Sequence, residues 1–111
     1  MQGIKMSEST VIKPVQIIDK EYIRFLEYEI PERKTKYWAV RNKKHGTRLG
    51  DIEWYGAWRK YCFFTVDGIV FDQKCMLEIV KFMHRQNLRH RAKLQNERFY
   101  HAKESEVKPC N

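Results

Sequence analysis

The clearest pattern in the chain is an alternation of apolar and polar residues in its middle third. Residues 36–42 and 49–55 each place their bulkiest apolar side chains at every second position. Successive side chains of a strand point to opposite faces, so both segments are predicted to be strands. One predicted face carries Trp38, Val40, Ile52 and Trp54, and the other carries Tyr37, Ala39, Arg41, Asp51, Glu53 and Tyr55.

Three further segments have strand character. Residues 60–65 (Lys-Tyr-Cys-Phe-Phe-Thr) are apolar at positions of both faces, which predicts the best buried strand of the sheet. Residues 23–30 are rich in β-branched and aromatic residues and are predicted as a strand, with a helix over 19–29, capped by Asp19, as the alternative. Residues 69–71 form either a short strand or an extended lead-in to the next element. Gly46 and Gly68 lie in the predicted connections.

A change of period after residue 71 indicates a helix. Asp72 is suited to cap its first turn, and the helix is predicted over about 73–86. Residues 84–101 keep helix-forming residues but have few apolar positions, so the helix either continues to about 99 as an exposed basic arm or frays. The apolar stripe that should cover the sheet is Met76, Ile79, Val80 and Met83, and Leu77 and Phe82 widen it.

These elements predict an α+β fold: a three- to four-stranded antiparallel meander packed against one C-terminal α-helix. Short connections favour pairing between strands that follow one another in the chain. A length of 111 residues corresponds to one domain. Residues 19–100 are predicted to form it, with 1–18 as a flexible N-terminal segment and 101–111 as a loose tail.

The charge of the chain is positive and uneven. The net charge is +8, and residues 31–60 carry nine Lys or Arg residues against three acids. A basic field of this kind attracts nucleic acid, acidic proteins or anionic membranes, although a basic surface that only maintains solubility is the alternative. No apolar run approaches the roughly 20 residues of a membrane span, and no signal peptide precedes the strands. A cytoplasmic protein without membrane contact is therefore expected.

The sequence contains no arrangement that indicates catalysis, and neither an enzyme activity nor a cofactor is expected. Asp51 and Glu53 share a strand face, but Arg41 and Lys43 on the neighbouring strand are predicted to pair with them. No C-x-x-C pair is present, so no metal site is expected. The scattered set that could otherwise be considered for zinc lacks a close ligand pair; it consists of Cys62, Cys75, His84 and His90.

The basic residues instead favour nucleic-acid binding without catalysis. Arg85, Arg89 and Lys93 would form one row on a continuing helix, although a solvated helix face is the alternative. Tyr55 or Trp58 could stack on bases. The residues predicted to contact phosphates are Arg59, Lys60, Arg85, Arg89, Arg91 and Lys93.

The same connection between strands supports a second hypothesis, a protein-interaction module. Tyr55, Trp58 and Arg59 are residue types that dominate binding energy at protein interfaces. A host protein would then be the partner. Alternatively, Trp58 folds back into the core and contributes to neither function.

The run from Trp54 to Phe64 also carries a resemblance. It reads W-Y-x-x-W-R-x-Y-C-F-F, follows Trp38-x-Val40-x-Asn42, and precedes a Leu77-x-Ile79-x-x-Phe82 helix. Over about 36–86 this resembles a group of small uncharacterised proteins of bacteriophages and prophages. The resemblance implies the cytoplasm of a bacterial host, where small basic phage proteins often bind DNA or inhibit a host protein. In element order alone, residues 36–90 are also similar to the plant ethylene-response-type domain and to phage integrase arm-binding domains.

Overall fold

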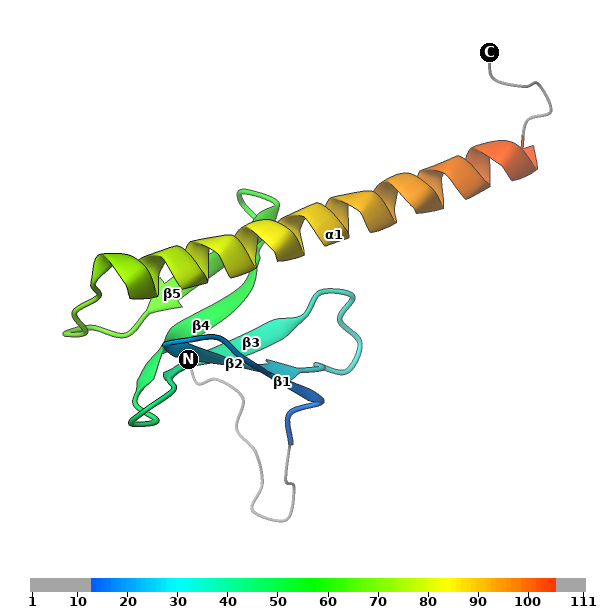
Figure 1. Ribbon diagram of the computed structural model, residues 1–111. Helices are drawn as coiled ribbons and strands as arrows, with labels where there is room; N and C mark the ends of the chain where they lie inside the picture. Colours follow the sequence, from blue (N-terminus) through cyan, green and yellow to red (C-terminus); the bar gives the residue numbers. More distant parts are fainter. Residues whose placement is uncertain (1–12, 106–111) are drawn as a thin grey trace.

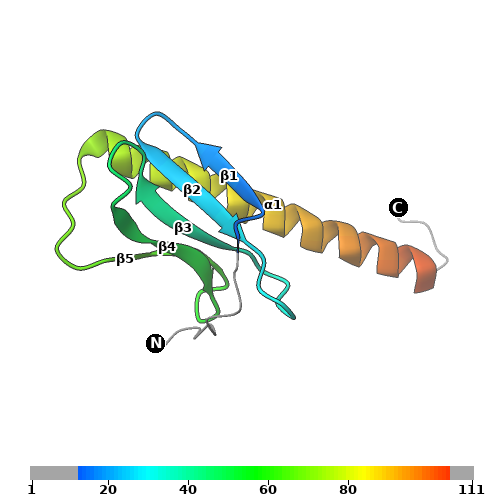
Figure 2. The ribbon, with the colours of Figure 1, turned by 90° about the horizontal axis from the view of Figure 1, so that it is seen from below.

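The computed structural model describes residues 13–105, with side chains described for 13–97. Five strands precede one long helix, and each strand pairs antiparallel with its neighbour in the chain, so that the sheet order is β1-β2-β3-β4-β5. The helix lies across one face of the sheet, and the opposite face, called the open face below, carries no other element of the described chain (Figures 1 and 2). The elements are β1 (Gln16–Asp19), β2 (Ile23–Tyr28), β3 (Tyr37–Asn42), β4 (Arg48–Tyr55), β5 (Lys60–Thr65) and α1 (Gln73–Ser105).

The predicted α+β meander with one C-terminal helix is confirmed, but the strand count of three to four is corrected to five. The missed strand is β1, a short edge strand whose sequence Gln-Ile-Ile-Asp has no alternation to detect. Residues 23–30 contain a strand rather than the alternative helix, and 69–71 form a lead-in without strand pairing. Of the predicted flexible ends, 1–12 and 106–111 lie outside the described residues, β1 begins at Gln16, and α1 continues to Ser105.

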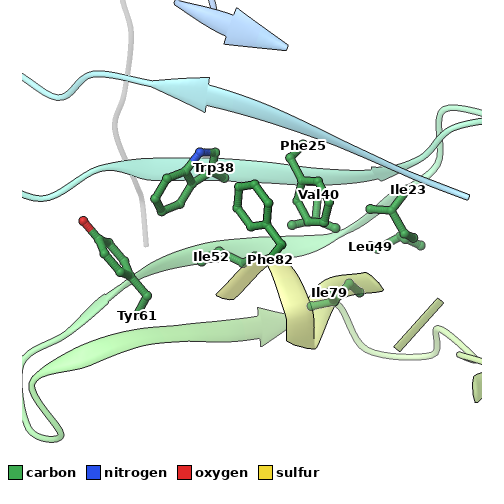
Figure 3. Packing of buried hydrophobic residues seen from close by; sticks show 9 residues of the cluster. All are labelled: Ile23, Phe25, Trp38, Val40, Leu49, Ile52, Tyr61, Ile79 and Phe82. Atoms are coloured by element: carbon green, nitrogen blue, oxygen red, sulfur yellow. The ribbon is translucent and has the colours of Figure 1, made fainter. Parts of the chain in front are cut away.

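The core is organised around Phe82, which α1 inserts into the covered face of the sheet (Figure 3). Its ring stacks on Phe25 with centroids 3.9 Å apart, and it meets the edge of Trp38 at 5.2 Å. Tyr61 closes the group with an edge contact to Trp38 at 5.1 Å. Offset and edge-to-face pairs add to the free energy gained from burying aromatic surface, so this cluster is the principal attachment of the helix.

The helix faces the sheet with a different stripe from the predicted one. Ile79 is buried and Met83 is partly buried as expected, but Met76 and Val80 are about half exposed. The prediction for these two residues is wrong because several residues that face the sheet are polar. A search for apolar residues at helical spacing does not detect them. The positions of α1 turned to the sheet are Cys75, Glu78, Ile79, Phe82, Met83, Gln86, Asn87 and His90.

Two of these polar residues bond to the sheet at separate points along the helix. The Glu78 carboxylate accepts the backbone N–H groups of Tyr22 and Ile23 at 3.0 and 3.1 Å. Asn87 accepts the Tyr61 N–H at 2.7 Å and donates to its carbonyl at 3.4 Å. Buried polar groups must be hydrogen-bonded to avoid a desolvation penalty, so these bonds fix the position of the helix along the sheet.

Strand β5 is less buried than its composition predicts. It lies at the edge of the sheet and pairs only with β4, and one of its faces belongs to the open face. Phe64 on that face is therefore 41% exposed, whereas Phe25, Trp38 and Ile52 on the inner strands are fully buried. The expectation that 60–65 is the best buried strand is wrong because apolar composition does not report which strand is central.

Gly50 permits the close approach of β4 and β5. Its φ is +157°, and a Cβ atom there would lie 2.4 Å from the carbonyl oxygen of Phe64 and 2.8 Å from the ring of Phe63. The register of β3 and β4 shifts at the same place, between Val40 and Arg41, which brings Leu49 into the core. Bulges of this kind bend a strand and increase its twist.

We expect the Gly50→Ala substitution to lower the free energy of unfolding by about 2 kcal/mol or more, because the new methyl group overlaps backbone as well as side-chain atoms. Gly56→Ala is the matched control, since nothing lies within 4 Å of its added Cβ. Urea denaturation followed by circular dichroism measures both. Equal stability of the two variants would contradict the proposed role of Gly50.

The phase of α1 is tested by two truncations on the same helix. Phe82→Ala should lower the free energy of unfolding by about 3–5 kcal/mol, the usual effect of removing a buried aromatic ring. Val80→Ala, at a half-exposed position of the predicted stripe, should change it by less than about 1 kcal/mol. A larger effect at Val80 than at Phe82, in the same denaturation assay, would contradict the orientation of α1 described here.

Candidate functional site

The β4–β5 hairpin lies beside the middle of α1, where the helix leaves the sheet (Figure 1). A cleft of about 420 Å³ opens between them, and we call it the hairpin cleft. The hairpin contributes Trp54, Arg59 and Lys60 to its lining, and the helix contributes His90, Arg91 and Leu94. Clefts of a few hundred Å³ are the usual size of small-ligand sites.

The turn of the hairpin determines which side chains reach this cleft. The Arg59 N–H donates to the carbonyl of Tyr55 at 2.9 Å, and Arg59 adopts a left-handed φ of +55°. Non-glycine residues adopt this conformation uncommonly. The tight turn brings Arg59 to the hairpin cleft, while Trp58 packs against Tyr55 on the open face. Lys60 is the cross-strand partner of Tyr55, so its side chain starts on the open face and the residue lines only the edge of the cleft.

Aromatic rings line the inner wall of the hairpin cleft. The Trp54 and His90 rings lie 4.5 Å apart between centroids, and Tyr61 meets their edges at 5.3 and 5.9 Å. Tyr61 is held in turn by its two hydrogen bonds with Asn87. The wall is therefore fixed in position before any ligand arrives.

The rim of the hairpin cleft is cationic. Arg59, Lys60 and Arg91 are exposed, and none of the ion pairs found among the described residues includes them. Burial lowers the pKa of His90, Lys93 acts in the same direction, and Glu97 opposes them. At neutral pH the site thus combines a neutral aromatic wall with three positive charges at its rim, an arrangement suited to a ligand with both a flat ring and an anionic group.

The structure brings together some of the residues predicted to contact phosphates and separates others. Arg59, Lys60 and Arg91 share the hairpin cleft. Arg85, Arg89 and Lys93 are exposed on α1 but do not line it, because their i, i+4 row runs along a different side of the helix. Sequence reasoning missed Trp54 and His90 as site residues. No spacing could reveal them, because they meet only through the approach of the hairpin to the helix.

A second surface, the aromatic cluster of Tyr55, Trp58 and Phe64, lies on the open face at the same hairpin. The Tyr55 ring packs edge-on against Trp58 at 5.1 Å and against Phe64 at 6.0 Å. Trp58 is 65% exposed, so the alternative in which it folds back into the core is wrong. Of the three residues predicted to bind a partner protein, Tyr55 and Trp58 share this cluster, while Arg59 belongs to the hairpin cleft.

The carboxylates of the open face are paired differently from the prediction. Asp51 forms an ion pair with Arg48 of its own strand, and Glu53 lies 3.8 Å from Arg33. Arg41 and Lys43, the predicted partners, instead donate to backbone carbonyls. The register accounts for the difference, since Asp51 lies opposite Ala39 and Glu53 opposite Tyr37, while the bulge in β4 places Arg41 opposite Arg48. These pairs reduce the negative charge that the open face would otherwise present.

Neither a metal site nor a membrane span is found in the described part of the chain. Within residues 13–105 no three His, Cys, Asp or Glu side chains gather as metal ligands would. Cys62 is on β5 and Cys75 is in the first turn of α1, and burial raises the pKa of the Cys75 thiol. None of the helical residues described forms a segment long and apolar enough to cross a membrane.

The fold and the site define a small basic α+β protein in which, over residues 13–105, a single helix lies across a five-stranded meander. Over 63 residues the chain is 38% identical to the "Uncharacterized 9.3 kDa protein" of Acholeplasma phage L2, and this match covers 57% of the chain and 81% of the phage protein. The chain therefore belongs to the same family as this phage protein. No family model matches the chain, and no solved structure matches it.

The lowered pKa of His90 predicts how pH affects stability. Because the folded state disfavours the protonated imidazole, the unfolded chain binds more protons, and stability falls as the pH drops through the ordinary histidine pKa of about 6.5. Between about pH 7 and pH 5 the wild type should lose more unfolding free energy than His90→Phe, which keeps an aromatic ring against Trp54. Urea denaturation at each pH measures the difference, and parallel losses in the two proteins would refute the prediction.

Proposed function

We propose that the protein is a non-enzymatic nucleic-acid-binding protein that contacts phosphates through the hairpin cleft and the basic flank of α1. The observation that carries this proposal is the convergence of Arg59, Lys60 and Arg91 on one cleft, with no acidic partner among the described residues. Charges left unpaired at a shared site attract a polyanion more effectively than the same charges scattered over a surface.

The exposed part of α1 extends this basic site. All described side chains from Arg91 to Glu97 are exposed, and the helix continues beyond the sheet to Ser105 (Figure 1). Arg85, Arg89 and Lys93 repeat every four residues along it, a spacing of about 6 Å that can follow a phosphate backbone. A helix that projects from its own sheet is accessible from several sides.

The proposal is tested by charge reversal with a matched control. Lys60→Glu with Arg91→Glu should weaken binding to labelled DNA at least about tenfold, because both cations of the rim become repulsive. Lys34→Glu with Lys44→Glu changes the net charge equally at exposed positions away from the hairpin cleft and should weaken it much less. Fluorescence anisotropy over a range of salt measures both, and the loss of about two phosphate contacts should reduce the salt slope by about 1.8 on a duplex.

Equal weakening by the two double variants would reduce the interaction to general attraction by net charge. Binding of the wild type that disappears at about 0.15 M salt, where charges more than ~8 Å apart are screened, would have the same meaning.

The aromatic cluster favours a second candidate function, a protein-interaction module that contacts a host protein. An exposed Trp supported by neighbouring Tyr and Phe rings resembles the anchors that supply most of the binding energy at protein interfaces. The two functions separate by mutation. Arg89→Glu with Arg91→Glu should remove nucleic-acid binding and spare a protein contact made by Trp58, provided that circular dichroism shows an intact fold.

A further inference from the structure

We infer that the nucleic acid this protein binds is single-stranded, with an unpaired nucleotide in the hairpin cleft and the neighbouring base on Trp58. This inference rests on the proposed function and names the form of nucleic acid that its site accepts. It joins the two surfaces of the β4–β5 hairpin, the hairpin cleft and the aromatic cluster, into one path.

The shape of the hairpin cleft favours an unpaired nucleotide over a duplex. A duplex presents its phosphates on a convex surface and keeps its bases stacked inside. Its bases therefore cannot contact aromatic rings that are recessed in a cleft. Trp54 and His90 form such a wall, and Leu94 adds an apolar side chain to it. A flat base can lie against this wall while its phosphate meets the cations at the rim.

The turn between the strands continues this path onto the open face. Trp58 and Arg59 are consecutive residues of the turn, so a strand that leaves the hairpin cleft at Arg59 and rounds the tip of the hairpin reaches the exposed Trp58 ring. That ring is braced edge-on by Tyr55, which keeps its orientation without covering it. Bases of single strands commonly stack on rings presented in this way, between cations that follow the backbone.

Electrostatic attraction alone would favour the duplex over the single strand. The order of the two affinities therefore tests the inference. A duplex has about twice as many phosphates as one of its strands and a higher charge density. If the net charge of +8 governed binding, the duplex would bind more tightly. A preference for the single strand would therefore oppose the effect of net charge, as contacts with unpaired bases do.

The experiment compares three labelled probes of about 12 nucleotides with the full-length protein: oligo-dT, oligo-U, and a duplex of the same length. Anisotropy at one moderate salt concentration should show both single strands binding at least about tenfold more tightly than the duplex. Tryptophan fluorescence should be quenched by the single strands, as stacking requires. Tighter binding of oligo-U than of oligo-dT would favour RNA as the ligand, and the reverse order would favour DNA.

Variants of Trp58 test the path itself. Trp58→Ala should weaken single-strand binding at least about fivefold and change duplex binding less than about twofold, whereas Trp58→Phe should retain most of the affinity. Val70→Ala, at another highly exposed apolar residue, is the matched control and should change neither. Urea denaturation of each variant verifies that its fold is intact.

Failure of the inference can be told from failure of the proposed function. If none of the three probes binds at moderate salt, the proposed function is wrong and the inference fails with it. If the duplex binds as tightly as the single strands, the proposed function stands and the inference is overturned. A single-strand preference that Trp58→Ala leaves unchanged, in a folded variant, also overturns the path described here.

Discussion

The contact of Phe82 with Phe25 and Trp38 is the interaction on which the rest of the structure depends. Within the described residues one helix covers the sheet, and that helix places one large ring over β2 and β3, two of the three inner strands. Because protein interiors are closely packed, a ring in this position determines the distance between the helix and the sheet. It also determines which side of the helix faces the sheet. The position of the hairpin cleft follows, since its helical wall begins two turns after Phe82.

Polar bonds then determine how far along the sheet the helix lies. An aromatic contact tolerates sliding and rotation better than a hydrogen bond does, whose geometry is narrow. Glu78 on one side of Phe82 and Asn87 on the other each bond to the backbone of the sheet. With the helix fixed at three points, His90 can lie against Trp54 and Arg91 can approach the β4–β5 turn. The site is thus placed by Glu78 and Phe82, which lie outside it, and by Asn87, which lines the hairpin cleft.

The strands and the helix of this fold can be predicted from the sequence more reliably than the way they pack together. Alternation identified β3 and β4, and β-branched and aromatic residues identified β2, because those patterns arise from local backbone geometry. The edge position of β5 and the phase of α1 depend on tertiary contacts, and the polar residues Glu78 and Asn87 concealed the true stripe. For the same reason the cationic residues Arg59, Lys60 and Arg91 could be selected from the sequence, while the wall formed by Trp54 and His90 could not.

The order of the elements along the chain has a consequence for how the protein is made. Each strand pairs with the strand synthesised immediately before it, so every hairpin closes only a short loop and can form as the chain lengthens. The residue that covers their apolar face, Phe82, is synthesised only after all five strands. Before Phe82 packs against them, Phe25 and Trp38 are exposed to water, and the apolar surface of the nascent sheet can associate with other chains. A substitution that delays helix formation after Asp72 would therefore reduce the yield of soluble protein before it changed the finished structure.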